Sequence, residues 1–274
     1  MAARFRLPTE IPIEEYPPPS TFVEEAIQCV KGADEQGIIL RVIGGLGIHL
    51  HADAPEFRQL AEKLGRLGER VFTDIDFASY GKFRDKVYEF FTKRGYKVDP
   101  TLHMHHFRKR HMYFAGKVPM AEVFFDSLEM NHTIQFASRL EADNPTLPLA
   151  ELLLGKLQIV RLNEKDVKDA ILLLRSHDVG ETDDETLNLN ALQQAGLLSD
   201  WGFYYTFTTN LKEVQRYVHQ YNVLTEDDAQ IVRQRVNRIL GYLEEQPKSQ
   251  RWRLRERIGT RKKWYNDVEE WMRL

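Results

Sequence analysis

The sequence of 274 residues has a single cysteine, Cys29, and lacks any long hydrophobic run. One cysteine excludes a disulfide framework and a cysteine-based zinc site within the chain. No segment approaches the roughly 18 consecutive apolar residues that a membrane-spanning helix needs, and the first residues lack the apolar core of a signal peptide. We therefore expect a cytoplasmic protein with no membrane partner.

A strong charge of either sign is also absent. The chain has 38 Lys and Arg residues against 41 Asp and Glu residues, which gives a net charge of -3. This balance provides no global basic field, so a nucleic-acid partner would need a local basic patch. The chain also lacks a Gly-Lys-Ser/Thr phosphate-binding loop. Gly45-Leu46-Gly47 has no third glycine, which excludes a dinucleotide-binding fingerprint.

Strand-like patterns concentrate in the first half of the chain. Five prolines in residues 1–20 predict an extended arm. We expect strands at 38–43, 71–78, 103–114 and 118–126, a linker at 181–187, and helices over most of the second half. The sequence thus predicts an α/β (α+β) fold, in which a mixed-sheet domain at residues 21–146 precedes a helical domain at 147–274.

Asp74 and Asp76 stand two residues apart on one predicted strand. Side chains at this spacing share a face, with their Cα atoms about 6.5–7 Å apart. Their oxygens can converge on one hard cation or bridge two. Oxygen ligands suit magnesium, which also accepts substrate phosphates. We therefore predict a site for one or two Mg²⁺ ions. The alternative is a solvated acidic pair without a function.

Gly44 and Gly45 end the preceding strand and complement the acidic pair. Glycine lets backbone N–H groups approach a phosphate without a Cβ atom in the way. A helix expected from Leu46 would add its positive N-terminus. A Gly-Gly pair alone is merely a turn. The order of strand, Gly-Gly, helix and Asp-Ile-Asp strand predicts a cradle for a nucleoside triphosphate beside the metal.

Two segments resemble the first motif of the nucleotidyltransferase superfamily: 42–49 (Val-Ile-Gly-Gly-Leu-Gly-Ile-His) and 73–77 (Thr-Asp-Ile-Asp-Phe). The similarity is greatest to the AbiEii-like toxin group and its uncharacterised relatives, and it covers about residues 38–170. In the family, Gly-Gly or Gly-Ser precedes Asp-x-Asp or Asp-x-Glu; the spacer here is longer than in most members. The resemblance implies transfer of a nucleoside monophosphate from an NTP to an acceptor hydroxyl, with release of pyrophosphate. The acceptor could be a tRNA end, a protein or a small molecule.

The resemblance also implies a third carboxylate on a neighbouring strand. Glu122, between Ala121 and Val123, matches the required pattern of an acid between apolar residues. Asp126 lies four residues further on and would share its face on a regular strand. We expect Glu122 to be the third acid, acting as metal ligand or as general base. The alternative is an acid on an edge strand that faces water.

The family also has later motifs, and the resemblance alone assigns roles to two residues in them. Lys156 would contact phosphates as a point charge, and Asp169 would orient a base or a lysine. Alternatively, Lys156 extends to the surface past its apolar neighbours. Asn163 is expected to cap the next helix, with Asp166 as its partner in the cap.

The last segment interleaves basic and aromatic residues, as RNA-binding surfaces do. Its basic residues are Arg251, Arg253, Arg255, Arg257, Arg261, Lys262 and Lys263. Acids such as Glu256 and Asp267 lie nearby, so we expect a solvated helix face with balanced charges. RNA contact is the alternative. His103 and His105 would share a strand face, but no third ligand for a metal is evident.

The sequence therefore predicts a metal-dependent nucleotidyltransferase. Asp74, Asp76 and Glu122 would hold magnesium, while the Gly44-Gly45 turn and Lys156 would hold the triphosphate. Two rivals remain. One is a catalytically silent nucleotide-binding or regulatory protein with the same fold, which a missing third carboxylate would favour. The other is a helical protein-interaction module.

Overall fold

The computed structural model describes residues 5–52, 54–65 and 71–268 and separates the chain into two units. The first unit comprises Met1–His51, Leu67–Leu128 and Gln135–Leu147, and the second comprises Ala52–Arg66, Glu129–Ile134 and Pro148–Leu274. The sequence assigned residues 52–66 and 129–134 to the α/β domain, whereas these two segments group with the helical unit.

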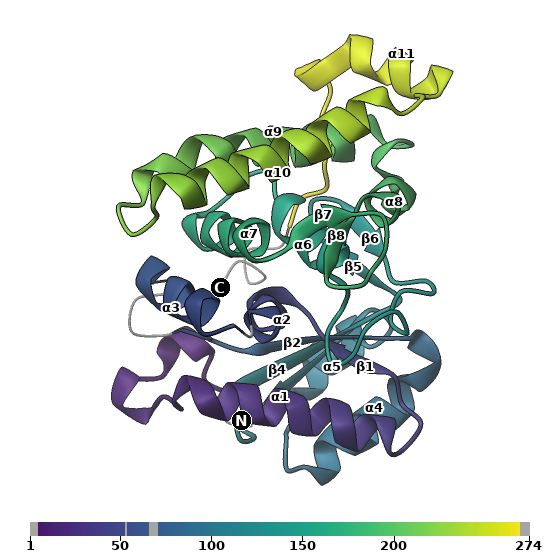
Figure 1. Ribbon diagram of the computed structural model, residues 1–274. Helices are drawn as coiled ribbons and strands as arrows, with labels where there is room; N and C mark the ends of the chain where they lie inside the picture. The colour runs from purple at the N-terminus through teal and green to yellow at the C-terminus, as the bar shows by residue number, and fades with distance from the viewer. Residues whose placement is uncertain (1–4, 53, 66–70, 269–274) are drawn as a thin grey trace. The chain divides into compact units, whose positions relative to one another are not determined.

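A four-stranded mixed sheet forms the centre of the first unit (Figure 1). Its strands are β1 (Leu40–Val42), β2 (Ile75–Ser79), β3 (Arg110–Phe114) and β4 (Met120–Phe125). In the order β1-β2-β4-β3, the β2 and β4 strands run parallel, and the two outer strands are antiparallel to their neighbours. The predicted mixed α/β class is confirmed at this level.

The first unit also contains helices. They are α1 (Pro19–Asp34), α2 (Gly44–His51), α4 (Arg84–Lys93) and α5 (Pro100–His106), with short 3-10 helices at Pro8–Glu10, Ile13–Glu15 and Gly81–Phe83. Phe22, Ala26 and Cys29 follow the helical repeat along α1 and are buried in the core with Val87 and Phe91 of α4. The two helices α1 and α4 thus bury the apolar side of the sheet.

Alternation along the strands places Asp76 and Glu122 on the sheet face that α1 and α4 do not cover. Ile75 and Phe77 of β2 belong to the core beneath α1 and α4, as do Ala121 and Val123 of β4. Successive side chains of a strand point to opposite faces. The residues between these pairs, Asp76 and Glu122, therefore point away from α1 and α4.

The second unit is built mainly from helices (Figure 1). These are α3 (Pro55–Leu64), α6 (Leu149–Leu157), α7 (Glu164–Ser176), α8 (Leu189–Leu192), α9 (Trp201–Tyr217), α10 (Glu226–Glu245) and α11 (Gln250–Ile258). A small parallel ladder joins β7 (Asp178–Gly180) to β8 (Thr186–Asn188). A second ladder pairs β5 (Ser127–Glu129) with β6 (Thr133–Gln135), where the chain passes between the units.

The predicted strand at 103–114 is wrong in its first half. Asp99 accepts hydrogen bonds from the backbone N–H groups of Thr101 and Leu102, and Pro100 occupies the first helical position. Such a cap starts a helix. His103 and His105 consequently lie on α5, so the strand face that they were expected to share does not form.

Other boundaries shift in the same way. The strand expected at 71–78 begins only at Ile75, so Asp74 immediately precedes it. The arm at 1–20 contains two 3-10 helices, and the expected linker at 181–187 lies between β7 and β8 and includes the start of β8. Helix α7 begins after its predicted cap, Asn163, and α10 begins after Thr225, whose side chain caps it.

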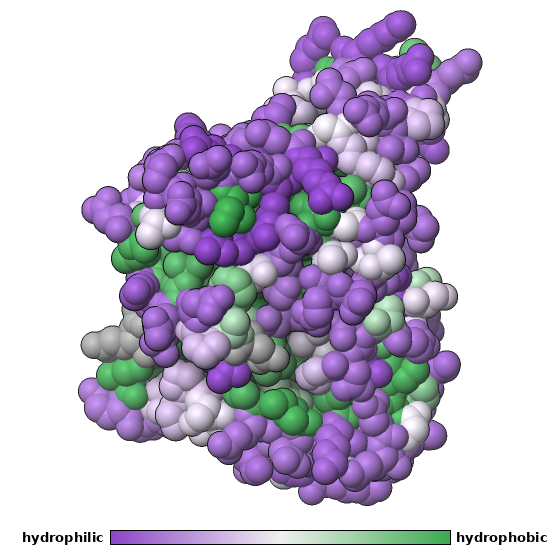
Figure 2. All heavy atoms as spheres, viewed as in Figure 1, coloured by the Kyte–Doolittle hydropathy of each residue, from purple (hydrophilic) through white to green (hydrophobic). Residues whose placement is uncertain are grey.

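In the described parts of the chain, no helix has both the length and the apolar character that crossing a bilayer requires. Figure 2 shows hydrophilic residues over most of the visible surface of α10 and α11, with smaller hydrophobic patches between them.

Candidate functional site

Asp76 and Glu122 lie directly opposite each other on the two parallel strands of the first unit. The register pairs Asp76 of β2 with Glu122 of β4, and Glu122 with Met112 of β3. Paired residues on adjacent strands have Cα atoms about 5 Å apart and point to the same face. The sheet therefore sets two carboxylates side by side on the face turned away from α1 and α4.

The Gly44-Gly45 turn brings backbone close to the same point. After β1, the Ile43 N–H donates to the Asp76 carbonyl oxygen at 2.9 Å. Gly44 then adopts a φ of +68°, and a Cβ atom there would lie 2.8 Å from Asp76 Oδ2. Glycine accepts this left-handed conformation at no steric cost. Gly45 follows in the first turn of α2, so neither residue of the turn places a side chain beside Asp76.

Asp74 is held by the segment that leads into β2. Its Oδ1 accepts a hydrogen bond of 3.0 Å from Thr73 Oγ1. The Thr73 carbonyl oxygen in turn accepts a 2.6 Å hydrogen bond from the Tyr16 hydroxyl. The N-terminal arm thus fastens the residue next to Asp74.

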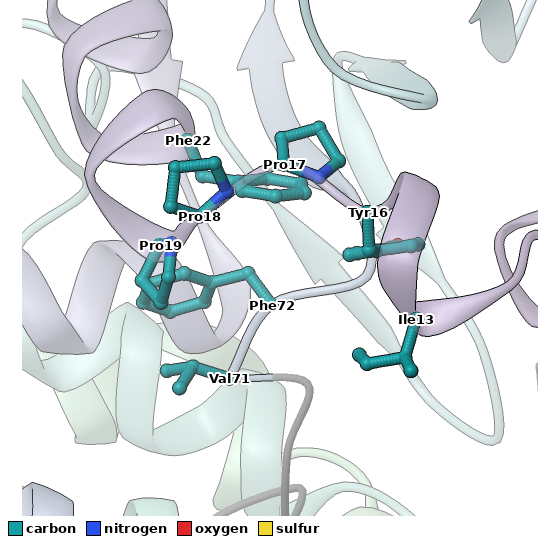
Figure 3. Close-up of a pocket in the computed structure, with 8 residues that line it drawn as sticks. All are labelled: Ile13, Tyr16, Pro17, Pro18, Pro19, Phe22, Val71 and Phe72. Carbon is teal, nitrogen blue, oxygen red and sulfur yellow. The ribbon is translucent and has the colours of Figure 1, made fainter.

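A pocket of about 210 Å³ lies where the arm meets this segment (Figure 3). It is lined by Ile13, Tyr16, Pro17, Pro18, Pro19, Phe22, Val71 and Phe72. The Phe72 ring packs against the rings of Phe22 and His49. Since the lining carries no charged side chain, we assign it no part in binding a metal or a phosphate; its walls fix the entry into β2.

Glu122 is buried, with 3% of its surface exposed. One of its oxygens, Oε2, forms an ion pair with the Arg110 guanidinium. The other oxygen, Oε1, has no hydrogen-bond partner among the described residues. Burial raises the pKa of Glu122 to about 7; the Arg110 cation opposes this rise and the Asp74 carboxylate adds to it. Glu122 therefore lies within electrostatic reach of Asp74.

Asp126, the alternative third acid, lies elsewhere. It follows β4 with a φ of +64° and is exposed. Its two oxygens accept hydrogen bonds from the Gly81 backbone N–H at 2.8 Å and from Arg84 Nη2 at 3.0 Å. Asp126 therefore organises the turn before α4, and Glu122 is the acid beside Asp76.

Lys156 and Asp169 come together in the second unit. Lys156 Nζ lies 2.8 Å from Asp169 Oδ2 and 3.3 Å from Asp166 Oδ1. The three side chains are largely buried, with 4–11% of their surfaces exposed. Asp166 was expected to be only a cap partner. Its backbone N–H does bond to Asn163 Oδ1, but its carboxylate is also a partner of the lysine, so that expectation was too narrow.

Sequence reasoning missed Arg110. The residue lies in the strand that was predicted at 103–114, where it was given no role, and only 7% of its surface is exposed. A strand beginning at position 110 would have placed Arg110 and Met112 on one face. Locating that start requires knowing that α5 ends just before it. The sequence alone therefore gives little indication that Arg110 lies on this face of the sheet.

The side chains of the first unit fit a hard divalent cation. Asp74, Asp76 and Glu122 offer oxygen ligands of the type that magnesium prefers, although their ligand atoms do not form a group in which all lie within 4.8 Å of one another. Glu122 Oε1 is a buried acceptor without a hydrogen-bond partner in the described part of the chain, and a bound cation would satisfy it. His103 and His111 are close, with ring centroids 4.6 Å apart. Both His111 nitrogens are already engaged, by the Tyr113 hydroxyl and the Phe107 carbonyl.

Comparison with known proteins adds no relative: no family model and no curated protein matches the chain significantly.

Proposed function

We propose that the protein is a metal-dependent nucleotidyltransferase that moves a nucleoside monophosphate from an NTP to an acceptor hydroxyl, as the resemblance to the AbiEii-like group suggests. The observation that carries the proposal is the pairing of Asp76 with Glu122 beside the Gly44 turn. It combines an acidic cation site with an open stretch of backbone. A triphosphate with its magnesium needs both features.

Each residue has a defined task in this proposal. Asp74, Asp76 and Glu122 would hold one or two Mg²⁺ ions, which when bound would neutralise the phosphates and stabilise charge on the attacking and leaving oxygens. The N–H groups of Gly44 and Gly45 and the start of α2 would bind the triphosphate. Alternatively, Glu122 would leave the metal to the two aspartates and take a proton from the acceptor hydroxyl as general base, since burial raises its pKa.

The resemblance also assigns roles to Lys156 and Asp169, which pair with each other in the second unit. The lysine would contact phosphates, and Asp169, 2.8 Å from its ammonium group, would orient it. The carboxylates fix the orientation of the lysine ammonium group. This favours binding of one phosphate group over nonspecific electrostatic attraction of anions.

The test is transfer of label. The protein is incubated with Mg²⁺, each of the four α-³²P-labelled NTPs in turn, and cell extract or total tRNA. We expect one nucleotide to label an acceptor and to release pyrophosphate. The same reaction with Asp74→Asn/Asp76→Asn protein supplies the control. No transfer with any nucleotide and acceptor would refute catalysis.

One observation favours a second candidate, a silent nucleotide-binding protein with this fold. The Arg110–Glu122 ion pair neutralises the third acid within the protein itself. If the neutralised Glu122 does not bind the cation, only Asp74 and Asp76 serve the metal. Calorimetry separates the two candidates: a silent protein would bind Mg²⁺-NTP without turnover.

A further inference from the structure

Arg110 shares a sheet face with the proposed metal ligands. In the antiparallel pairing of β3 with β4, Met112 is opposite Glu122 and Arg110 is opposite Phe124. Arg110 and Glu122 are therefore diagonal neighbours on one face, within reach of a long side chain. The Arg110 guanidinium lies 4.9 Å from the centre of the Phe124 ring and forms an ion pair with Glu122.

This contact constrains Glu122 in an asymmetric way. Arg110 holds Oε2, whereas Oε1 has no hydrogen-bond partner in the residues that the structure describes. Both side chains are buried, with 9% and 4% of their surfaces exposed. A buried carboxylate oxygen without a partner is destabilising, so a purely structural ion pair would be expected to satisfy both oxygens.

We propose that Arg110 is a positioning residue for the proposed metal site: it holds Oε2 of Glu122 and thereby presents Oε1 to the cation that Asp74 and Asp76 bind. This inference rests on the proposed function. The planar guanidinium is suited to the task because the Phe124 ring supports its face while one N–H group, on Nη2, holds Oε2 of the carboxylate. Lysine would keep the charge without the planar fork.

The experiment measures binding of Mn²⁺ alone, without nucleotide, by the electron paramagnetic resonance signal of the free ion. Wild-type protein is expected to bind Mn²⁺, and Asp74→Asn/Asp76→Asn is expected not to. Arg110→Met should weaken the affinity at least tenfold. Arg110→Lys should weaken it three- to tenfold, because an ammonium group lacks the planar face that packs on the Phe124 ring.

Arg41 provides a matched control. It is 7% exposed, as Arg110 is, and lies in the same row of the sheet, where Arg41 pairs with Ala78 and Ala78 pairs with Phe124. Its guanidinium bonds to Asp34 and to the Asp143 carbonyl, away from the three acids. Arg41→Met should lower stability and leave the Mn²⁺ affinity unchanged.

The outcomes separate the two proposals. Wild-type affinity in folded Arg110→Met protein, together with loss in the aspartate variant, would overturn the role of Arg110 and leave the metal site standing. Absence of Mn²⁺ binding by wild-type protein would overturn both. If Arg110→Met does not fold, Arg110→Lys decides, since unchanged affinity in that variant contradicts the need for the planar fork.

Discussion

A Cβ atom on Gly44 would lie 2.8 Å from Oδ2 of Asp76. No real side chain tolerates such a separation without movement, so these two residues are fitted to each other. Asp76 can occupy its position because residue 44 has no side chain, and the backbone of the turn remains open for the same reason. The Gly-Gly motif and the Asp-x-Asp motif, about 30 residues apart in the sequence, thus form one structural unit.

The first prediction tests this fit. Gly44→Ala should lose stability from its positive φ and from the collision with Asp76. Gly37→Ala is the control, because Gly37 has a nearly equal φ of +67° and nothing within 4 Å of its Cβ position. We expect Gly37→Ala to cost about 1 kcal/mol and Gly44→Ala about 1–3 kcal/mol more, measured by urea unfolding. Equal losses of stability in the two variants would show that Asp76 moves away from the added Cβ atom without cost.

The second prediction concerns the acids. Asp74→Asn/Asp76→Asn should abolish Mg²⁺-dependent NTP binding in calorimetry and leave the circular dichroism spectrum intact, because both side chains belong to the proposed cation site. Asp126→Asn is the control, since Asp126 is exposed and bonded to Gly81 and Arg84. Binding that survives in the double variant would exclude the metal role.

The third prediction concerns acid stability. Burial lowers the pKa of His111 to about 3, and nearby His103 and Arg84 contribute to the shift. Because the unfolded state keeps a pKa near 6.5, it binds the additional proton between pH 6.5 and pH 3. The contribution of neutral His111 to the free energy of unfolding is therefore fully present above pH 6.5. Below that pH it falls by about 1.4 kcal/mol per pH unit.

His111→Gln should remove this component, so the loss between pH 6.5 and 5 should shrink by about 2 kcal/mol. His105→Gln, which changes an exposed histidine of α5, should leave the wild-type slope unchanged. Urea unfolding at the two pH values provides the comparison. An identical acid slope in His111→Gln and wild-type protein would show that His111 is already protonated in the folded state.

The fourth prediction concerns Lys156. Removing its ammonium group leaves the buried carboxylates of Asp166 and Asp169 facing each other, so Lys156→Met should cost about 3 kcal/mol in urea unfolding. Adding Asp169→Asn to Lys156→Met should restore part of the lost stability, because one uncompensated charge disappears. A loss below about 1 kcal/mol would place the lysine in solvent. If Lys156 also contacts phosphate, its replacement lowers NTP affinity in folded protein.

The fifth prediction concerns the basic face of α11 and the residues after it. Arg253, Arg257 and Lys262 are exposed, and the described residues provide none of them with an ion pair; Asp267 pairs with Lys263 instead. The expected balance by neighbouring acids stays a prediction for these three cations, since Glu269, one of those acids, lies outside the described residues. The aromatic residues of the segment turn inward, with Trp252 against Tyr204 and Trp264 bonded to Thr206. Any RNA contact here would rely on phosphates.

We expect Arg253→Glu/Arg257→Glu to cost less than about 1 kcal/mol in stability. The same variant should weaken tRNA binding and reduce the log–log salt slope by about 0.7–0.9 for each lost phosphate contact. Filter binding at low and moderate salt measures this, with exposed Lys212→Glu as the control. Equal salt slopes in variant and wild-type protein would remove α11 from the acceptor surface.

The sequence by itself determined the features that depend on neighbours along the chain. Asn163 caps α7 where the sequence predicts, because a cap bonds to backbone two or three residues away. The mixed α/β fold class followed from the spacing of apolar residues in the predicted strands and helices. The Gly44 turn and the acids on alternate positions were visible for the same reason, since turn preferences and strand alternation are local properties.

Only the tertiary structure decided how these pieces meet. The register of β3 on β4 gives Glu122 its partner Arg110, and the parallel pairing of β2 with β4 sets Glu122 beside Asp76 while leaving Asp126 on a turn. Strand register is fixed by packing of the whole apolar face on α1 and α4, so one residue of slip would reverse every side chain. No pattern within a single segment contains that information, because the energies that select it come from residues far apart in the chain.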